Sequence, residues 1–313
     1  MKNLLARFLV ATRNLDRSLI YIAAISGGRD SVVLLHLIRS AGFKNVVVCH
    51  FDHGVRKQSI SDAEFVSQLA HRSEMRVINE KAATSTDASE STLRTARYAF
   101  FARAARETNA SGVFLGHHAD DLAETFLWNL LRGSGTAGLS GMQPDRVVKT
   151  DAGSIRLLRP MLEIWRSEID QYAADNALTH VEDASNRSRK FTRNRLRHDI
   201  LPWLESKLDR PVRQNLHRAA TIFRDENEAL DALVPPIADA LQTADLLTIP
   251  IALQRRTILA WLRHHAVSDA GYTEVELVRS LLEIEASPAR VNLTGNLQAR
   301  RRAGRITIAN QVG

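Results

Sequence analysis

The chain has 313 residues, enough for two domains and a sizeable hydrophobic core. Hydrophobic residues make up 44% and charged residues 25%, which is typical of a soluble globular protein, and the net charge of +7 is compatible with a polyanionic partner. The single cysteine, Cys49, excludes an intrachain disulfide framework and a CxxC metal or redox site, and favours a reducing, cytoplasmic compartment. No apolar run approaches the roughly 20 residues of a membrane span, and the N-terminus predicts a short amphipathic helix.

The first strand–loop–helix unit carries the most informative motif. The apolar run 19–25 predicts a buried strand, and residues 32–38 predict a helix that ends at Gly42. A glycine turn before a helix directs backbone N–H groups at a phosphate, although an ordinary strand-to-helix turn is the alternative. Because a carboxylate beside phosphates is repulsive unless a divalent cation lies between them, Asp30 predicts Mg²⁺. The complete loop is Ser26, Gly27, Gly28, Arg29, Asp30 and Ser31.

This loop differs from the two common phosphate-binding motifs, because neither G-x-x-x-x-G-K-[ST] nor G-x-G-x-x-G occurs in the chain. It resembles the SGGxDS pyrophosphate loop of the N-type ATP pyrophosphatases, which split ATP to AMP and pyrophosphate. That superfamily includes amidotransferase synthetases, NAD synthetases, tRNA-thiolating enzymes and tRNA(Ile)-lysidine synthases. The loop alone does not choose among them.

Strands and helices then alternate along the chain. The alternation predicts an α/β fold with a doubly wound, mostly parallel sheet. Asp52 and His53 follow the second strand, where such sheets bind ligands, although a polar turn explains them equally well. The predicted strands are 46–51, 75–78 and 112–116, and the predicted helices are 61–71, 91–108 and 120–132.

Histidines and carboxylates are concentrated directly after the strand at 112–116. His117 precedes Asp121 by four residues, and Asp121 precedes Glu124 by three, so these side chains share one helix face. Acidic residues also suit the first turn of a helix, which is the purely structural interpretation. A pocket for Mg²⁺ or for an ammonium substrate fits better than a zinc site, because no distant His/Cys set completes one.

Arginines form a second group of candidates. Arg94 and Arg97 share one face of the helix at 91–108. Residues 187–197 contain six basic residues and no acidic one, so phosphate contact is a better interpretation than a solvated face. The six are Arg187, Arg189, Lys190, Arg193, Arg195 and Arg197, with Phe191 among them.

The rest of the chain predicts a second, smaller α+β domain. Residues 133–141 are glycine-rich and predict a flexible loop, 146–148 and 155–158 predict a hairpin, and 201–233 predict continuous helix up to Pro235 and Pro236. We therefore expect a catalytic domain at 1–205, a helical linker at 206–236 and a small substrate-binding domain at 237–313.

Several motifs, in the right order, resemble the tRNA(Ile)-lysidine synthase family. The resemblance is strong over roughly residues 17 to 205 and weak beyond them. Leu122 departs from the family pattern, in which glutamine is more usual at this position. The matching segments are Arg94-x-x-Arg97-Tyr98, 116–125, 129–135, Arg159-Pro160, Glu182-Asp183-x-x-Asn186 and 193–197.

The resemblance implies ATP and Mg²⁺ as cofactors, and free L-lysine and an isoleucine tRNA with a CAU anticodon as substrates. Mg-ATP would adenylate O2 of the first anticodon cytidine and release pyrophosphate. The ε-amine of lysine would then attack C2 and expel AMP, leaving lysidine. The base must leave its stack to present O2, so a pocket and a cationic surface are expected.

The site residues follow from these motifs as hypotheses. The loop Ser26–Ser31 binds the pyrophosphate of ATP, with Asp30 acting through Mg²⁺. Asp121 and Glu124 hold the lysine ammonium or a second Mg²⁺, and His117 contacts phosphate or relays a proton. Phosphate charge is stabilised by Arg97 and by Arg193, Arg195 and Arg197, the last three facing the tRNA.

Three rival functions are weaker. A tRNA-thiolating enzyme needs a cysteine pair or an Fe–S cluster, which Cys49 alone does not supply. An amidotransferase or NAD synthetase would leave the basic cluster without a role. A non-catalytic RNA-binding protein has no need of Asp30, Asp121 and Glu124.

Overall fold

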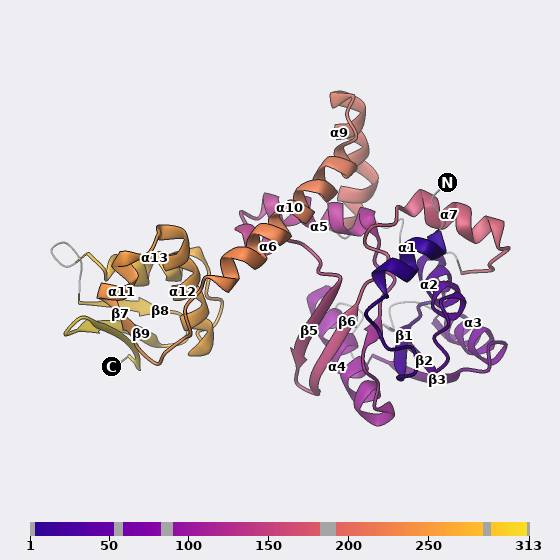
Figure 1. Cartoon of the computed structure of the whole chain (residues 1–313), viewed down its shortest axis with the longest axis horizontal. Coiled ribbons are helices and arrows are strands. Elements are labelled where there is room, and N and C mark those ends of the chain that lie inside the picture. The colour runs from indigo at the N-terminus through magenta and orange to yellow at the C-terminus, as the bar shows by residue number, and fades with distance from the viewer. Residues whose placement is uncertain (1–3, 53–58, 83–89, 182–191, 284–288, 312–313) are drawn as a thin grey trace. The chain divides into compact units, whose positions relative to one another are not determined.

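A computed structural model of the chain describes residues 4–52, 59–82, 90–181, 192–283 and 289–311 (Figure 1). It divides into two compact units, Met1–Arg224 and Asp225–Gly313. The boundary lies inside helix α10 (Val212–Ala232), within the stretch that the sequence interpretation assigned to a linker.

The first unit is built on a six-stranded sheet with the order β3-β2-β1-β4-β6-β5. All pairs are parallel except β5 with β6, which form the expected hairpin. The mostly parallel α/β architecture is therefore confirmed. The order reverses between β1 and β4, so the loops after these two strands flank the position where such sheets bind ligands. The strands are β1 (Tyr21–Ala24), β2 (Val46–Asp52), β3 (Arg76–Lys81), β4 (Val113–Phe114), β5 (Asp145–Thr150) and β6 (Gly153–Leu158).

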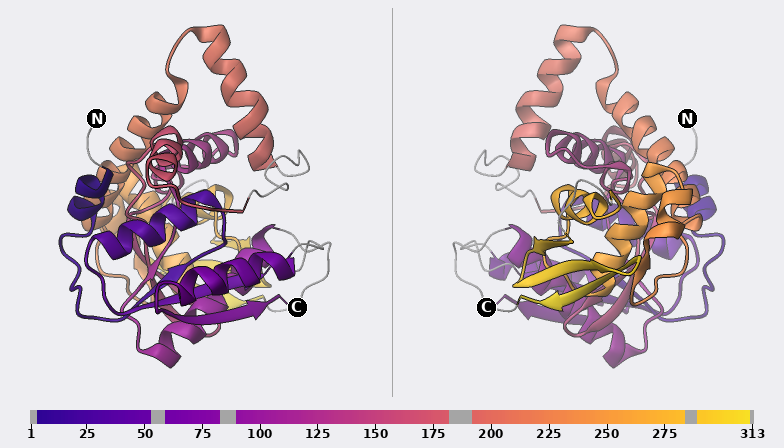
Figure 2. Two further views of the ribbon diagram at one scale, coloured as in Figure 1. Left: turned by 90° about the vertical axis from the view of Figure 1, so that its right-hand side faces the viewer. Right: turned by 90° about the vertical axis from the view of Figure 1, so that its left-hand side faces the viewer.

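Helices cover both faces of this sheet (Figure 2). Alternate residues of β2 separate into two cores: Val46 and Val48 pack with α2 and α7, and Val47 and Cys49 pack with α4. Strands buried on both faces are continuous apolar runs, which is why β1 and β2 are recognisable in the sequence. The helices of this unit that precede α8 are α1 (Leu4–Ala11), α2 (Arg29–Ser40), α3 (Ser59–His71), α4 (Glu90–Thr108), α5 (Ala119–Leu131), α6 (Thr136–Leu139) and α7 (Arg166–Asp175).

Two segments differ from the sequence interpretation. The glycine-rich stretch 133–141 contains the one-turn helix α6, and Asn129 Nδ2 donates a hydrogen bond to the Gly138 carbonyl at 2.7 Å. The helical region 201–233 is interrupted at Asp209, whose left-handed backbone (φ 47°) ends one helix before Pro211. The region therefore comprises α9 (Leu201–Leu208) and α10, and it is preceded by α8 (Thr192–Arg195) and a π-helical turn (Leu196–Ile200).

The second unit has its own hydrophobic core around Trp261, which is fully buried. Its antiparallel sheet has the order β7-β10-β9-β8, so the smaller α+β domain is confirmed. Its short elements β7, α11 and β8 had no clear sequence signal. The elements are β7 (Leu241–Gln242), α11 (Thr243–Thr248), α12 (Ile251–His264), α13 (Tyr272–Ser280), β8 (Arg290–Leu293), β9 (Leu297–Arg302) and β10 (Arg305–Asn310).

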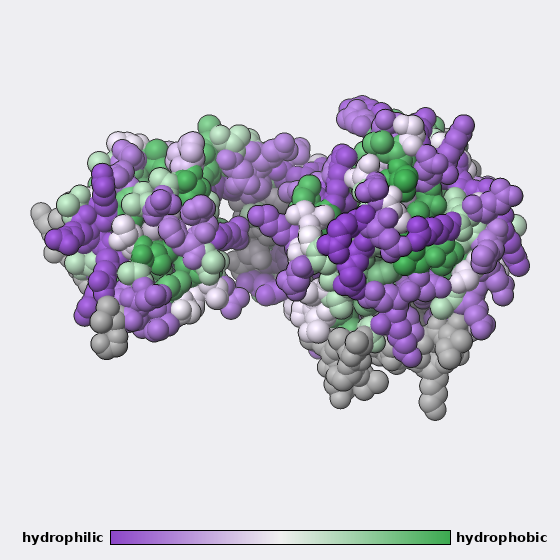
Figure 3. Space-filling model, turned by 90° about the horizontal axis from the view of Figure 1, so that it is seen from below, coloured by the Kyte–Doolittle hydropathy of each residue, from purple (hydrophilic) through white to green (hydrophobic). Residues whose placement is uncertain are grey.

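The face of the protein drawn in Figure 3 is mostly hydrophilic, with apolar residues gathered in smaller patches on each unit. In the part of the chain that the structure describes, no helix combines the length and the hydropathy needed to cross a bilayer.

Candidate active site

The loop between β1 and α2 has the backbone geometry of a phosphate cradle. Gly27 has φ +88°, and a Cβ there would lie 3.4 Å from both Phe65 and Val66 of α3. Ser31 Oγ donates to the Gly28 carbonyl at 2.7 Å and accepts from the Ser26 backbone N–H at 3.2 Å, which fixes the turn. Gly28 precedes α2 and has no side chain that could cap it. The first backbone N–H groups of the helix therefore point toward the space above the loop, where they can bind an anion.

Asp30 lies in the first turn of α2, and its Oδ1 atom is buried without a hydrogen-bond partner among the described residues. Burial alone would raise the pKa of this carboxyl, but the hydrogen bond and charge of His118, with Arg166, outweigh burial and lower it. A buried carboxylate oxygen with an unused lone pair is the ligand type that Mg²⁺ prefers. In the described part of the chain, no three His, Cys, Asp or Glu side chains are arranged around one ion site. The fit is therefore to a metal that takes Asp30 together with substrate phosphate oxygens.

His118, which the sequence interpretation did not select, connects the loop to helix α5. Its imidazole is 1% exposed; Nε2 lies 3.7 Å from Asp30 Oδ2 and 3.5 Å from Asp121 Oδ2, and Nδ1 lies 3.6 Å from Asp120 Oδ2. Burial alone would lower the pKa of His118, but Asp121, Asp120 and Asp30 together raise it to about 10. A buried imidazolium therefore holds the ends of two elements together. The sequence signal was present, because aspartates stand at three and two residues beyond His118.

Asp121 and Glu124 converge on one face of α5, as their spacing predicts, and both are buried. They bind two guanidinium groups. Arg193 Nη2 lies 3.0 Å from Asp121 Oδ1, and its Nε lies 3.2 Å from Glu124 Oε2. Arg197 Nε lies 2.6 Å from Glu124 Oε1, and its Nη2 lies 2.8 Å from Asp121 Oδ1.

This arrangement changes the interpretation of the basic cluster. Its own run contains no acidic residue, but Arg193 and Arg197 find acidic partners about 70 residues earlier in the chain. Burial alone would raise the pKa of Asp121, but His118 and Arg193 outweigh it and lower the value, so the carboxyl is ionised. In this structure the two carboxylates expected to hold an ammonium are neutralised by two arginines.

The remaining predicted side chains occupy three different surroundings. His117 Nδ1 is buried and has no hydrogen-bond partner among the described residues. Burial keeps the pKa of this imidazole well below its usual value, although the charge of Asp121 acts in the opposite direction. The charges of Arg159, Arg193 and Arg97 lower the pKa further. It is therefore a neutral histidine. Arg97 lies on α4 close to His117, whereas Arg195 is exposed and donates to Thr192 Oγ1 at 3.2 Å. Eight candidates lie outside the described residues: His53, Glu182, Asp183, Asn186, Arg187, Arg189, Lys190 and Phe191.

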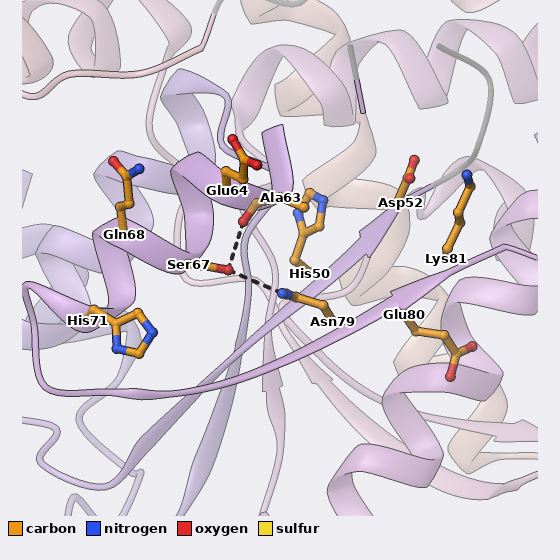
Figure 4. A pocket seen from close by; sticks show the side chains of 10 residues that line it. All are labelled: His50, Asp52, Ala63, Glu64, Ser67, Gln68, His71, Asn79, Glu80 and Lys81. Carbon is orange, nitrogen blue, oxygen red and sulfur yellow. Dashed lines mark hydrogen bonds between the residues drawn. The ribbon is translucent and has the colours of Figure 1, made fainter. Parts of the chain in front are cut away.

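A cavity of about 580 Å³ opens between α3 and the carboxyl ends of β2 and β3 (Figure 4). Asp52, a predicted nucleotide neighbour, lies at its wall together with His50 and Lys81. The His50 ring Nδ1 is 2.9 Å from the Ile25 carbonyl, so this cavity adjoins the strand that leads into the phosphate loop. Ser67 Oγ donates to the Ala63 carbonyl and accepts from Asn79 Nδ2.

Comparison with known families gives two matches that divide the chain. The PP-loop domain matches residues 2–204, and the TilS substrate binding domain matches residues 241–307. The fold of the U34-tRNA thiolase NcsA from Methanococcus maripaludis is similar, with a TM-score of 0.55 at 14% identity over 70% of this chain and 79% of that one.

Three of the curated relatives that match carry the name tRNA(Ile)-lysidine synthase. The protein from Gloeobacter violaceus is 36% identical over 250 residues, which is 77% of this chain and 76% of that protein. The protein from Synechococcus sp. (strain ATCC 27144) is 32% identical over 83% of this chain and 82% of its own. The relative from Solibacter usitatus is 33% identical over 84% of this chain, and the match spans only 61% of the length of that relative. On these matches, and on the phosphate loop and carboxylate pair described above, the chain belongs to the tRNA(Ile)-lysidine synthase family.

Proposed function

We propose that this protein ligates free lysine to C2 of the first anticodon cytidine in an isoleucine tRNA that bears CAU, with cleavage of ATP to AMP and pyrophosphate. Family membership supports the overall reaction. The structural observation that carries the proposal is the position of His118 between Asp30 and Asp121, 3.7 and 3.5 Å from their nearest oxygens. It keeps a phosphate loop beside a carboxylate pair, as a ligation between a nucleotide-activated group and an amine requires.

The first step is adenylation of the base. O2 of the cytidine attacks the α-phosphorus of ATP, an O–P bond forms, and the bond to the β-phosphate oxygen breaks as pyrophosphate leaves. The loop Ser26–Ser31 is suited to hold the departing pyrophosphate through backbone N–H groups and serine hydroxyls. Mg²⁺ held by Asp30 would neutralise the charge that develops on the phosphate oxygens.

The second step is attack by the lysine ε-amine on C2. A C–N bond forms, the C2–O2 bond breaks, and AMP leaves with the former base oxygen. The amine must lose a proton, and His117 is a candidate to accept it because its imidazole is neutral and its Nδ1 has no partner among the described residues. Asp121 and Glu124 remain the candidates for holding lysine, and an ammonium would take the place of a guanidinium of Arg193 or Arg197. The displaced arginine would then be available to a phosphate.

Thiolation of a tRNA base is the rival that the fold similarity raises. Cys49 is the single cysteine in the sequence, and it is buried in β2. Burial and the charge of Glu107 raise the pKa of its thiol to about 12, so it is a poor nucleophile. These features favour ligation over sulfur transfer.

The products of ATP cleavage test the proposal. Purified protein is incubated with ATP and Mg²⁺, with and without lysine and a transcript of the CAU-bearing isoleucine tRNA. We expect AMP and pyrophosphate in equal amounts, formed only when the tRNA is present. Release of ADP, or cleavage that ignores the tRNA, would contradict the proposed chemistry. The absence of any cleavage would favour a non-catalytic RNA-binding protein.

A further inference from the structure

The π-helical turn Leu196–Ile200 leaves one backbone carbonyl without its usual helical donor. In an α-helix the Arg197 carbonyl would accept a hydrogen bond from the N–H of Leu201, but that N–H donates to the Leu196 carbonyl instead. The next position along the chain has no N–H to offer, because residue 202 is proline. The Arg197 carbonyl therefore needs a donor from another element.

Arg213, in the first turn of α10, supplies that donor. Its Nη2 atom donates a hydrogen bond to the Arg197 carbonyl at 3.2 Å. Glu205 of α9 fixes the arginine further, because its carboxylate accepts from the Arg213 backbone N–H at 3.2 Å and from Nη1. The side chain of Arg213 is 22% exposed, so these contacts are partly shielded from water.

The same guanidinium reaches helix α5, which carries the carboxylate pair. Arg213 Nε lies 3.7 Å from Asp120 Oδ1, in the first turn of α5. Asp120 Oδ2 accepts a hydrogen bond from the Arg166 backbone N–H at 2.9 Å and lies 3.6 Å from His118 Nδ1. Burial alone would raise the pKa of Asp120, but its contacts with these three residues outweigh burial and lower it. The carboxylate that Arg213 faces is therefore ionised.

Apolar packing brings α5, the π-helical turn and α10 to one place. Leu127, Leu196 and Leu201 form a buried cluster, with one residue each from α5, the turn and α9. Leu216, three residues beyond Arg213 in α10, packs against this cluster. The backbone that carries Arg213 is thus fixed relative to both elements that its side chain contacts.

Arg213 therefore joins the two sides of the carboxylate–arginine contact. On one side is α5, with Asp121 and Glu124. On the other is Arg197, whose guanidinium donates three hydrogen bonds to these carboxylates at 2.6, 2.8 and 2.9 Å. Arg193 donates two longer ones, at 3.0 and 3.2 Å. Arg197 is the more firmly held arginine, because both its guanidinium and its backbone carbonyl are bonded.

We propose that Arg213 is a positioning residue for the transfer of lysine. It fixes the gap between α5 and the π-helical turn, and so keeps Arg197 against the two carboxylates while the substrate ammonium replaces Arg193. The lysine ε-amine must meet C2 in one geometry, and a misplacement of about 1 Å costs roughly a hundredfold in rate. The inference rests on the proposed function for the identity of the lysine site.

The two steps of the proposed reaction are measured separately. The first is pyrophosphate release with tRNA, ATP and Mg²⁺ but without lysine, and the second is lysidine formation when labelled lysine is added. Without Arg213, Asp120 keeps its contacts with His118 and Arg166, whereas the Arg197 carbonyl loses its donor. We therefore expect Arg213→Gln to lower kcat/KM for lysine about tenfold, while the rate of pyrophosphate release stays within about twofold.

Two further variants separate positioning from stability. Arg218→Gln, at an exposed position of the same helix, is the matched control and should leave both steps unchanged. Arg213→Lys keeps the charge but not the planar fork, so its kcat/KM for lysine should lie between those of the parent protein and Arg213→Gln. A merely structural role would lower both steps in proportion to the folded fraction. That result, or an unchanged kcat/KM for lysine, would overturn the proposal.

Pro202→Ala tests the point at which Arg213 acts. Alanine restores an N–H at position 202, which can donate to the Arg197 carbonyl as the next bond of the π-helical turn. In this background the loss caused by Arg213→Gln should shrink by about threefold or more. Equal losses in both backgrounds would show that the carbonyl contact carries no effect, and would contradict the proposal.

Exchange of backbone amide hydrogens tests the same link without any activity. Arg213→Gln should exchange faster than the parent protein over residues 196–204, and Arg218→Gln should not. Unchanged exchange overturns the proposal even if the protein does not transfer lysine. Failure of the parent protein to transfer lysine would contradict the proposed function instead, so the two failures are distinct.

Discussion

At the scale of single residues, the site depends on charges that are buried together. His118 lies among three aspartates from two elements, and Asp121 with Glu124 faces two arginines, one from α8 and one from the π-helical turn. Each charged group is stable only because its partners are present. Single substitutions here should therefore act on both stability and activity, and experiments must separate the two.

The raised pKa of His118 gives stability a defined pH dependence. Its folded-state value of about 10 lies above the unfolded value of about 6.5, so its contribution is complete below pH 6.5 and disappears as the pH rises through 10. In Mg²⁺-free buffer, the free energy of unfolding should fall over this interval. For His118→Gln, the free energy of unfolding should fall less steeply with pH. For His71→Gln, at an exposed position, it should change with pH as in the parent protein. Parallel denaturant-derived curves for all three would show that His118 is not charged in the folded state.

Removal of the carboxylate charges tests the lysine site. Asp121→Asn and Glu124→Gln should each raise the lysine KM and lower turnover by about tenfold or more, because a charge-assisted contact to the ammonium is lost. Glu124→Gln should also destabilise the fold by about 3 kcal/mol, since it leaves two partly buried guanidinium groups to share the carboxylate of Asp121. Asp145→Asn, in an exposed pair with Arg156, serves as the control. Intact lysine KM and turnover in both variants would remove Asp121 and Glu124 from the lysine site.

The residue string 26–31 and the spacing of Asp121 and Glu124 were predictable, because each motif is local in the sequence. For His118, the spacing to Asp120 and Asp121 is also local, but its contact with Asp30, about 90 residues earlier, was not predictable. The acidic partners of Arg193 and Arg197 were not predictable either, because they lie about 70 residues earlier in the chain. A charge run shows its own composition, but not which helix the fold brings against it.

At the scale of elements, the loop between β1 and α2 takes a backbone conformation that suits glycine. Gly27→Ala would strain the left-handed backbone by about 1–2 kcal/mol and press a methyl group toward Phe65 and Val66. Gly42→Ala is a matched control, because Gly42 has φ +85°, lies at the other end of α2 and has no described atom within 4 Å of the place where a Cβ would stand. We expect both variants to lose stability, measured by denaturant unfolding. Only Gly27→Ala should raise the ATP KM, and an equal ATP KM in the two variants would contradict the role of the loop.

Long apolar or amphipathic elements were predictable, and short ones were not. β2 and α5 have strong periodic patterns, so their bounds agree with expectation within one or two residues. β7 has two residues and α6 has four, too few to show any period. The break before α10 depends on the left-handed conformation of Asp209, which leaves no periodic signal.

At the scale of the whole molecule, each unit has a core of its own. Trp261→Ala should destabilise the second unit by about 3–5 kcal/mol, because it empties a fully buried site and removes the donor to the Asp239 carbonyl. Calorimetry should show the transition of the second unit at a lower temperature, while AMPCPP still stabilises the first. A single transition that moves as a whole would contradict two independently cored units.

The division into a larger α/β part and a smaller α+β part was predictable from the change in strand and helix pattern. The exact residue of the boundary within the expected linker was not, because it falls within the continuous helix α10. The amphipathic pattern of a helix does not indicate the residue at which one compact unit ends and the next begins.

The most direct test of the central claim is the transfer of labelled lysine to RNA. The protein is incubated with ATP, Mg²⁺, labelled lysine and a transcript of the CAU-bearing isoleucine tRNA. A CAU-bearing methionine tRNA and the Asp30→Ala enzyme serve as controls. We expect label in the isoleucine tRNA alone, at the first anticodon cytidine, and none with Asp30→Ala. Pyrophosphate release without lysine transfer would retain base adenylation but contradict ligation, and label in both tRNAs would contradict the proposed substrate specificity.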